Sequence, residues 1–189
     1  MNIVLLGFMG TGKTVVGKLL AGKLEMRYID IDEDIEKEEK STISRIFSRL
    51  GEGYFRSLEK KKVAEISQGD NQVISAGGGV VLNPENIENL ERDGVLFCLD
   101  AAPEVIFERT RRYTHRPLLE TAEPQKAIEA LLRKRSGYYQ KIKNHIDTSD
   151  LNPEEVVQKV IRIYGKINKK INHRGHGEKN KRQTTDKHR

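Results

Sequence analysis

Three glycines, a lysine and a threonine hydroxyl lie within residues 7–14, GFMGTGKT. The stretch fits the pattern G-x-x-x-x-G-K-[ST], in which glycines let successive backbone N–H groups point into one concavity that binds phosphate oxygens. In such a loop Lys13 reaches the β- and γ-phosphates, and the Thr14 hydroxyl binds Mg²⁺. The alternative is a tight turn with a solvated lysine. The strand pattern before the loop and the helical pattern after it favour a nucleoside triphosphate site.

Two aspartates follow in the stretch YIDIDEDIE, at the end of a second apolar run. Asp30 and Asp32 are two residues apart, so both lie on one face of an extended chain. Asp30 could hold Mg²⁺ through water, and Asp32 could accept a proton from an attacking hydroxyl. The alternative is that Asp32 and the two acidic residues after it only cap and charge the next helix. Both interpretations can hold together.

Glycines and arginines supply a third group of candidates. Gly77, Gly78 and Gly79 directly follow an apolar run, which favours close approach of the backbone to a ligand, with a flexible turn as the alternative. Arginines gather in RTRRYTHR and RKR, and we expect about half of them to be solvated. Arg116 stands apart because it precedes Pro117 in a segment, about residues 112–124, long enough to form a mobile lid. A lid arginine could neutralise charge on a transferring phosphoryl group.

The elements that must position these residues follow from hydrophobic patterning. Apolar runs of strand length alternate with segments of helical period, which predicts βαβ units and a parallel sheet with helices on both faces. The expected fold is a three-layer α/β/α domain of the P-loop NTPase type. We expect strands at 2–6, 27–31, 72–76, 95–99 and 145–149. We expect helices at 13–24, in two short stretches ending near 50, and at about 54–66, 84–92, 103–112, 123–143 and 153–167.

Charge is distributed unevenly along the 189 residues. Nine of the 34 Lys and Arg residues and two of the 28 Asp and Glu residues lie in residues 166–189, so this segment has a net charge of +7 and residues 1–165 have −1. A nearly neutral body has no global field to attract nucleic acid. The aliphatic pattern ends after Ile171, which predicts one domain over residues 1–165 and a disordered basic tail over 166–189.

The single cysteine, Cys98, lies in the apolar run GVLFCLD, where burial in a strand is expected. One thiol cannot form an internal disulfide, which indicates a reducing compartment. The sequence shows no signal peptide pattern and no apolar stretch of membrane-spanning length. We therefore expect a cytoplasmic protein without a membrane partner.

Six stretches, GFMGTGKT, YIDID, GYFRSLE, SAGGG, RPLL and RSGYY, together resemble the shikimate kinases in order and spacing, over about residues 1–165. The P-loop alone is generic, whereas its combination with D-x-D, F-R-x-x-E, G-G-G and R-P-L is specific. The resemblance implies phosphorylation of the 3-hydroxyl of shikimate by ATP with Mg²⁺, a step toward chorismate and the aromatic amino acids. It also implies a small-molecule substrate. The nearly neutral body predicts no specific nucleic-acid partner, and we expect a monomer.

The resemblance assigns a role to each candidate. Lys13 and Arg116 are the phosphoryl-binding cations, and Asp32 holds the reactive hydroxyl. Arg56 and Arg135 bind the shikimate carboxylate. The remaining assignments are the phosphate loop, Gly10, Thr11, Gly12, Lys13 and Thr14; the magnesium pair, Thr14 and Asp30; the adenine contacts, Arg109 and Pro153; and the wall of the shikimate pocket, Gly77, Gly78 and Gly79.

Three alternatives stay open. The family usually reads R-x-P-x-Y where this chain has RSGYY, so Arg133 competes with Arg135 for the carboxylate role. A gluconate-type kinase also needs cations for a carboxylate. A nucleotide-dependent protein that binds RNA or a protein partner through the basic tail belongs to another class, and the neutral body disfavours it.

Overall fold

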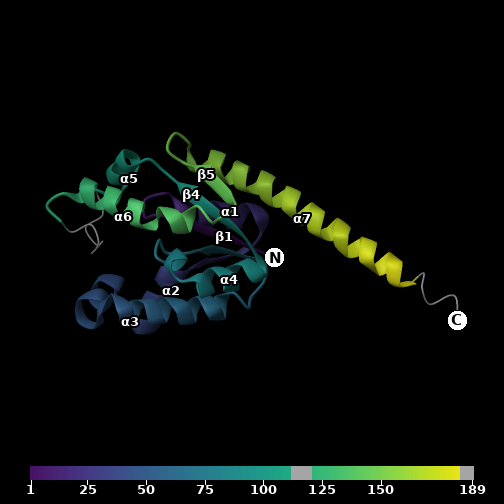
Figure 1. Cartoon of the computed structure of the whole chain (residues 1–189), viewed down its shortest axis with the longest axis horizontal. Helices are drawn as coiled ribbons and strands as arrows, with labels where there is room; N and C mark the ends of the chain where they lie inside the picture. The colour runs from purple at the N-terminus through teal and green to yellow at the C-terminus, as the bar shows by residue number, and fades with distance from the viewer. Residues whose placement is uncertain (112–120, 184–189) are drawn as a thin grey trace.

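The computed structural model describes residues 1–111 and 121–183, with side chains to residue 170. Five strands form one parallel sheet in the order β2-β3-β1-β4-β5 (Figure 1). They are β1 (Asn2–Gly7), β2 (Arg27–Asp30), β3 (Gln72–Ser75), β4 (Gly94–Asp100) and β5 (Asn144–Asp147). All six residues of β1 are buried, as expected for a central strand covered by helices on both faces.

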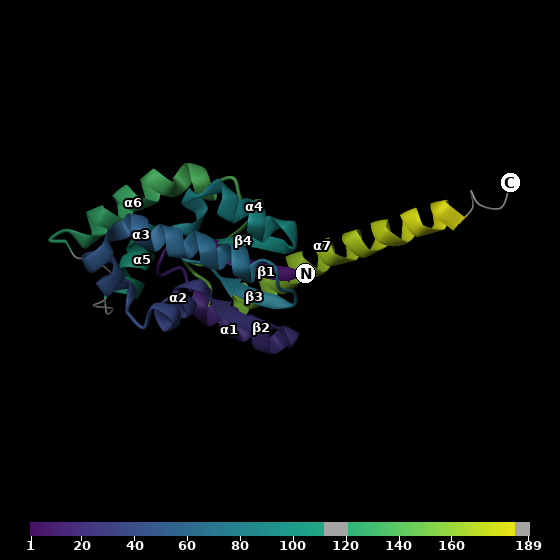
Figure 2. The ribbon, with the colours of Figure 1, turned by 90° about the horizontal axis from the view of Figure 1, so that it is seen from below.

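Helices cover both faces of the sheet. They are α1 (Lys13–Leu24), α2 (Ile31–Glu39), α3 (Ile43–Ile66), α4 (Pro84–Arg92), α5 (Pro103–Thr110), α6 (Pro124–Tyr139) and α7 (Pro153–Gln183), with a short 3₁₀ helix, η1 (Val80–Leu82). Alternate β1 residues enter two separate cores: Val4 and Leu6 pack toward α3 and α4, whereas Ile3 and Leu5 pack toward α1 and α7. Figure 2 shows α1 on the opposite side of the sheet from α3, α4 and α6. The predicted fold class is confirmed.

Several helix ends differ from the sequence-based expectation, most clearly in α3 and α7. The helix predicted to start near residue 54 is the second part of α3, which begins at Ile43 and is kinked at Gly51, where φ is 80°. Glycine adopts this backbone conformation without steric cost. Gly51 can therefore join two helical stretches that were expected to be separate helices.

The last helix is longer than predicted. The expected end near Ile167 is wrong, since α7 continues to Gln183 and extends away from the body of the molecule (Figure 1), so residues 166–183 are helical where disorder was expected. The segment contains no proline, so nothing interrupts the backbone hydrogen-bond ladder. Ile167 still packs against the core on the α1 face. The domain boundary at residue 165 stays a prediction.

Candidate active site

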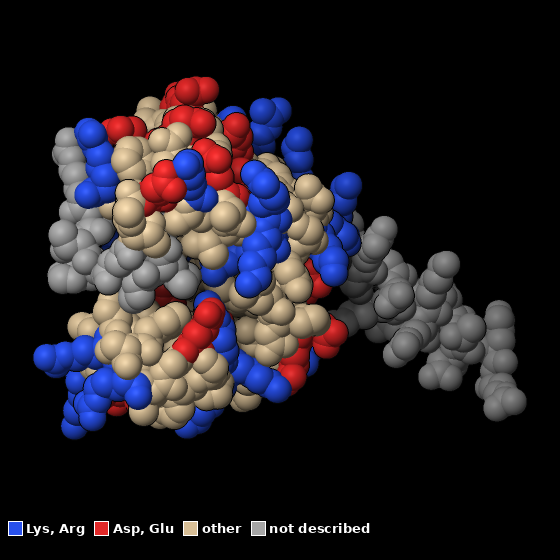
Figure 3. Space-filling view, turned by 60° about the vertical axis from the view of Figure 1, so that its left-hand side comes forward, with Lys and Arg blue, Asp and Glu red and all other residues tan. Residues whose placement is uncertain are grey.

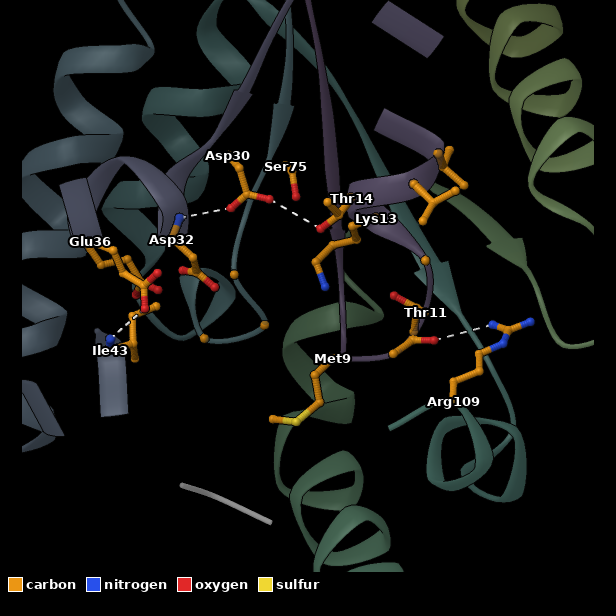
Figure 4. A pocket seen from close by; sticks show the side chains of 18 of the residues that line it. Met9, Thr11, Lys13, Thr14, Asp30, Asp32, Glu36, Ile43, Ser75 and Arg109 are labelled. Carbon is orange, nitrogen blue, oxygen red and sulfur yellow. Dashed lines mark hydrogen bonds between the residues drawn. The ribbon is translucent and has the colours of Figure 1, made fainter. Parts of the chain in front are cut away.

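A cavity of about 1420 Å³ opens at the carboxyl ends of the strands, the edge at which ligands bind in open parallel sheets. Figure 4 shows Lys13, Thr14, Asp30 and Asp32 around it. Every predicted site residue within the described part of the chain lines this cavity, namely Gly10, Thr11, Gly12, Lys13, Thr14, Asp30, Asp32, Arg56, Gly77, Gly78, Gly79, Arg109, Arg135 and Pro153. Arg116 and most of the predicted lid lie outside the described residues.

The loop between β1 and α1 has the winding expected of a phosphate-binding loop. Gly10 and Gly12 have φ values of 81° and 95°, which glycine adopts readily and other residues rarely do. Gly12 is the N-cap of α1, so the free N–H groups of the first helical turn face the cavity. The Lys13 ammonium donates to the carbonyl oxygens of Gly7 and Phe8, at 2.8 and 2.9 Å. The lysine is thus held across the loop.

Asp30 links the loop to the second strand. Its Oδ2 accepts hydrogen bonds from the Thr14 hydroxyl at 3.3 Å and the Tyr28 hydroxyl at 3.0 Å. Its Oδ1 accepts from the backbone N–H groups of Asp32 and Glu33, so Asp30 is the N-cap of α2. The cap is thus Asp30 and not Asp32, whereas Asp32 lies in the acidic first turn of α2, as the charging part of that alternative expects, with its side chain lining the cavity.

Oxygen atoms gathered in this way suit Mg²⁺. The Thr14 Oγ1 and Asp30 Oδ2 atoms are 3.3 Å apart, close to the spacing of about 2.9 Å between adjacent ligands in octahedral magnesium. Hydroxyl and carboxylate oxygens are the ligands that this hard cation prefers. The residues present therefore fit the ion.

Arg56 forms the opposite wall with two acidic partners that precede and follow it on α3. Its Nη1 donates to both carboxylate oxygens of Glu59, and its Nη2 donates to Glu52 at 2.8 Å. Glu59 is buried, with 2% of its side chain exposed. Burial, together with the nearby charge of Asp32, raises the pKa of Glu59 to about 7 despite the opposing attraction of Arg56.

Each glycine of the 77–79 run lies against a charged side chain. A Cβ atom on Gly77 would lie 2.7 Å from Asp32, and one on Gly79 would lie 2.1 Å from Arg56. The Gly78 carbonyl accepts from Arg135 at 3.1 Å and from the Tyr139 hydroxyl at 2.7 Å. The absence of side chains in this run lets the backbone approach the three charged groups closely.

The two candidate arginines on α6 differ in position, while the role of either one toward a carboxylate stays a prediction. Arg135 is buried, lines the cavity and lies over the Phe8 ring, with 5.7 Å between the guanidinium carbon and the ring centroid. Arg133 is exposed and does not line the cavity. The missing proline in RSGYY therefore leaves Arg135 directed inward.

At the far end of the cavity, Arg109 joins α5 to the loop after β5. It donates to the Thr148 hydroxyl at 3.0 Å and the Thr148 carbonyl at 2.7 Å. It also donates to the Gly10 carbonyl at 3.4 Å, which joins it to the phosphate loop (Figure 4). Pro153, at the start of α7, lines the same end. This places a planar guanidinium and a proline ring beside the phosphate loop.

Sequence reasoning missed several lining residues, of which Glu59 and Thr148 matter most. Glu59 lies three residues after Arg56, within the F-R-x-x-E pattern, and this helical spacing was a usable signal for an ion pair. Thr148 was assigned only to a strand. Its hydroxyl donates to the Thr11 and Asp100 carbonyls and accepts from Arg109, a set of long-range contacts that no local pattern reveals.

Comparisons with known proteins agree on one family. A family model described as "Shikimate kinase" matches residues 9–164. The chain is 51% identical to a shikimate kinase of Thermodesulfovibrio yellowstonii, over 88% of this chain and 96% of that protein. It is 48% identical to one of Caldanaerobacter subterraneus, over 88% and 97%. The chain belongs to the shikimate kinase family.

Solved structures give the same result. The shikimate kinase of Acinetobacter baumannii, determined in complex with shikimate, superposes with a TM-score of 0.83 at 33% identity, covering 86% of this chain and 92% of that one. A gluconokinase from Sinorhizobium meliloti superposes with a TM-score of 0.57 at 16% identity, covering 92% and 96%. The second likeness shows the shared fold alone and does not favour the gluconate alternative.

Proposed function

We propose that this protein transfers the γ-phosphate of ATP to the 3-hydroxyl of shikimate, forming shikimate 3-phosphate on the route to chorismate and the aromatic amino acids. The observation that carries the proposal is a single cavity with two chemically distinct ends. One end has the phosphate loop with Lys13, and the other has Asp32 with the guanidinium groups of Arg56 and Arg135. These are the groups needed to bind a nucleotide and a small hydroxylated carboxylate side by side.

The nucleotide end would hold ATP through the phosphate loop. Backbone N–H groups of Gly10, Thr11 and Gly12 and the first turn of α1 would bind the phosphate oxygens. Thr14 and Asp30 would hold Mg²⁺, which neutralises phosphate charge when it is bound. Arg109 and Pro153 would lie on either side of the adenine.

The acceptor end would fix shikimate through its carboxylate. Arg56 and Arg135 would bind the two carboxylate oxygens in fork geometry, which a planar guanidinium provides and an ammonium does not. Gly77, Gly78 and Gly79 would form the wall against the ring of the substrate. With the carboxylate held at one side, the hydroxyls of the ring would face Asp32.

Catalysis would then consist mainly of positioning and charge stabilisation. Asp32 would orient the 3-hydroxyl and accept its proton as the oxygen attacks the γ-phosphorus in line with the leaving β-phosphate oxygen. Lys13 would exchange its contacts with the loop carbonyls for the β- and γ-phosphate oxygens. Arg116, from the predicted lid, would neutralise charge on the transferring group.

We further infer a monomer in the cytoplasm that has no specific nucleic-acid partner. Basic and acidic side chains both occur on the face of the body shown in Figure 3, in keeping with the nearly neutral charge of residues 1–165. Within the described residues, no helix is both long and apolar enough to span a bilayer. The cytoplasmic location rests on the single cysteine, the absence of a nucleic-acid partner rests on charge, and the monomer is an expectation from the sequence alone.

The family assignment alone does not test which hydroxyl of shikimate lies next to Asp32, whereas the position of the phosphate in the product does. The product of shikimate and ATP, purified after complete turnover, should show one phosphorus resonance with scalar coupling to the proton on carbon 3. Coupling to a proton on carbon 4 or 5 would show that Asp32 meets a different hydroxyl.

A further inference from the structure

Three potential metal ligands lie on one face of two paired strands, away from the catalytic cavity. Cys98 and Asp100 are two residues apart on β4, so their side chains share a face. His145 on β5 is the register partner of Cys98, so its side chain lies on that same face. None of the three lines the catalytic cavity. The strand pairing alone therefore brings a thiol, a carboxylate and an imidazole together.

These side chains contact one another in a chain centred on the carboxylate. The His145 Nδ1 atom is 2.6 Å from Asp100 Oδ2, and the Cys98 thiol donates to Asp100 Oδ1 at 3.3 Å. One ligand atom from each residue lies within 4.8 Å of the other two. Tetrahedral zinc needs its sulfur, nitrogen and oxygen ligands about 3.3 to 3.6 Å apart. The contact between the thiol and the carboxylate, at 3.3 Å, already has that spacing, whereas the contact between the imidazole and the carboxylate, at 2.6 Å, is shorter and would have to lengthen.

We propose that Cys98, Asp100 and His145 bind a zinc ion between β4 and the edge strand β5. A thiolate, an imidazole and a carboxylate form a ligand set that borderline-soft cations prefer, whereas Mg²⁺ prefers oxygen ligands alone. The site is therefore chemically separate from the Thr14 and Asp30 pair. Three protein ligands leave the fourth tetrahedral position for water.

The three proposed zinc ligands differ in their exposure to solvent. Cys98 is fully buried, while 43% of the Asp100 side chain and 36% of the His145 side chain are exposed. An ion can thus enter from solvent past Asp100 and His145. In the metal-free protein, burial and the Asp100 carboxylate raise the pKa of the Cys98 thiol, so it carries a proton that zinc would displace.

Metal binding would strengthen the edge of the sheet next to the nucleotide end of the cavity. β5 is a four-residue edge strand joined to the sheet through β4 alone. The Asp100 carbonyl accepts hydrogen bonds from the Thr148 N–H at 2.8 Å and the Thr148 hydroxyl at 2.9 Å. A ligand that binds only the folded protein raises its stability by mass action.

Cobalt spectroscopy on the full chain tests the site directly, because Cys98 is the single cysteine. Bound Co²⁺ should give an intense near-ultraviolet sulfur-to-cobalt charge-transfer band, and added Zn²⁺ should remove it with 1:1 stoichiometry. Zn²⁺ in competition with a chromogenic chelator should bind at least about tenfold more weakly to C98S and to H145Q. Excess Zn²⁺ should raise the Tm of the parent protein by at least about 3 °C and that of H145Q by much less.

The tail supplies the matched control, because His173 and His176 form a second potential pair by sequence. The double variant H173Q/H176Q should keep the charge-transfer band and the zinc affinity of the parent. Loss of zinc binding in that variant, with retention in C98S and H145Q, would overturn the proposal. Absence of a sulfur-to-cobalt band would also overturn it. H145Q keeps the test valid if C98S fails to fold, because His145 is partly exposed.

Discussion

Arg56 donates through one nitrogen to both carboxylate oxygens of Glu59, at 2.9 and 3.0 Å. Its other nitrogens donate to Glu52, at 3.2 and 2.8 Å, so the guanidinium is held on two sides at the wall of the cavity. A group fixed before the substrate arrives loses less conformational entropy on binding it. Glu59 therefore acts as a positioning residue for Arg56.

Replacement of Glu59 by glutamine should weaken acceptor binding selectively. E59Q keeps the size of the side chain but loses the charge that holds Arg56, so we expect the KM for shikimate to rise about tenfold at pH 8 with the KM for ATP nearly unchanged. E52Q is the matched control. Glu52 is about half exposed and Glu59 remains in that variant, so a smaller effect is expected. Equal changes for both substrates in E59Q would contradict the positioning role.

The pKa of Glu59 also predicts how stability depends on pH. The folded protein holds this carboxyl at a pKa of about 7, above its ordinary value of 4.5, so the folded state binds the proton more tightly than the unfolded state. The contribution of Glu59 to the free energy of unfolding is therefore largest below pH 4.5 and is lost as the pH rises through about 7. Between pH 5 and pH 8, the free energy of unfolding of the parent, measured with urea, should fall by on the order of 2 kcal/mol relative to that of E59Q. If the free energies of unfolding of the parent and E59Q differed by the same amount at both pH values, the raised pKa of Glu59 would be refuted.

Substitution of Gly79 by alanine should displace Arg56 without unfolding the protein. The φ of Gly79 is −98°, which alanine adopts freely, but the new Cβ would lie 2.1 to 2.4 Å from three guanidinium atoms of Arg56. We expect at least a tenfold rise in the KM for shikimate and a small change in Tm. G53A is the control, since Gly53 lies on the same helix as Arg56 and a Cβ there meets nothing within 4 Å. G53A should keep the parent KM, and a normal KM in G79A would rule out the close-packed wall.

The sequence predicted the layers of the fold because alternation between strand and helix periods is a local property of the chain. It predicted the phosphate loop and the D-x-D pair for the same reason, since their spacing along the chain sets their geometry. Thr148 could not be found in this way, because its contacts with Thr11 and Arg109 depend on the order of the strands. The kink at Gly51 and the length of α7 were missed because backbone continuity does not require an apolar pattern.

Lys13 should be essential to turnover but not to folding. Its ammonium donates to the Gly7 and Phe8 carbonyl oxygens of the loop at 2.8 and 2.9 Å. The γ-phosphate charge that it would meet is greatest in the transition state. K13M should lower kcat by about 10²- to 10³-fold. Circular dichroism and Tm close to those of the parent would show that the fold survives. Near-normal turnover in folded K13M would reject the phosphate-loop role.

Removal of residues 172–189 should leave catalysis intact. Ile167 packs against the core, whereas the sequence after Ile171 contains no aliphatic residue that could extend this packing. We expect kcat/KM for shikimate and Tm to stay within error of the parent, and retention on heparin to fall because the removed residues are basic. A Tm lower by several degrees, or loss of most activity, would show that the tail packs on the domain.

The proposed reaction is the transfer of a phosphoryl group from ATP to shikimate, with both substrates bound in this cavity. The most direct measurement is coupled ADP release by the purified full chain with Mg²⁺ and ATP, compared with shikimate, with gluconate and with no acceptor. Shikimate should support turnover that K13M lowers by about 10²- to 10³-fold, and gluconate should give the same rate as no acceptor. Turnover with gluconate but not with shikimate would contradict the account.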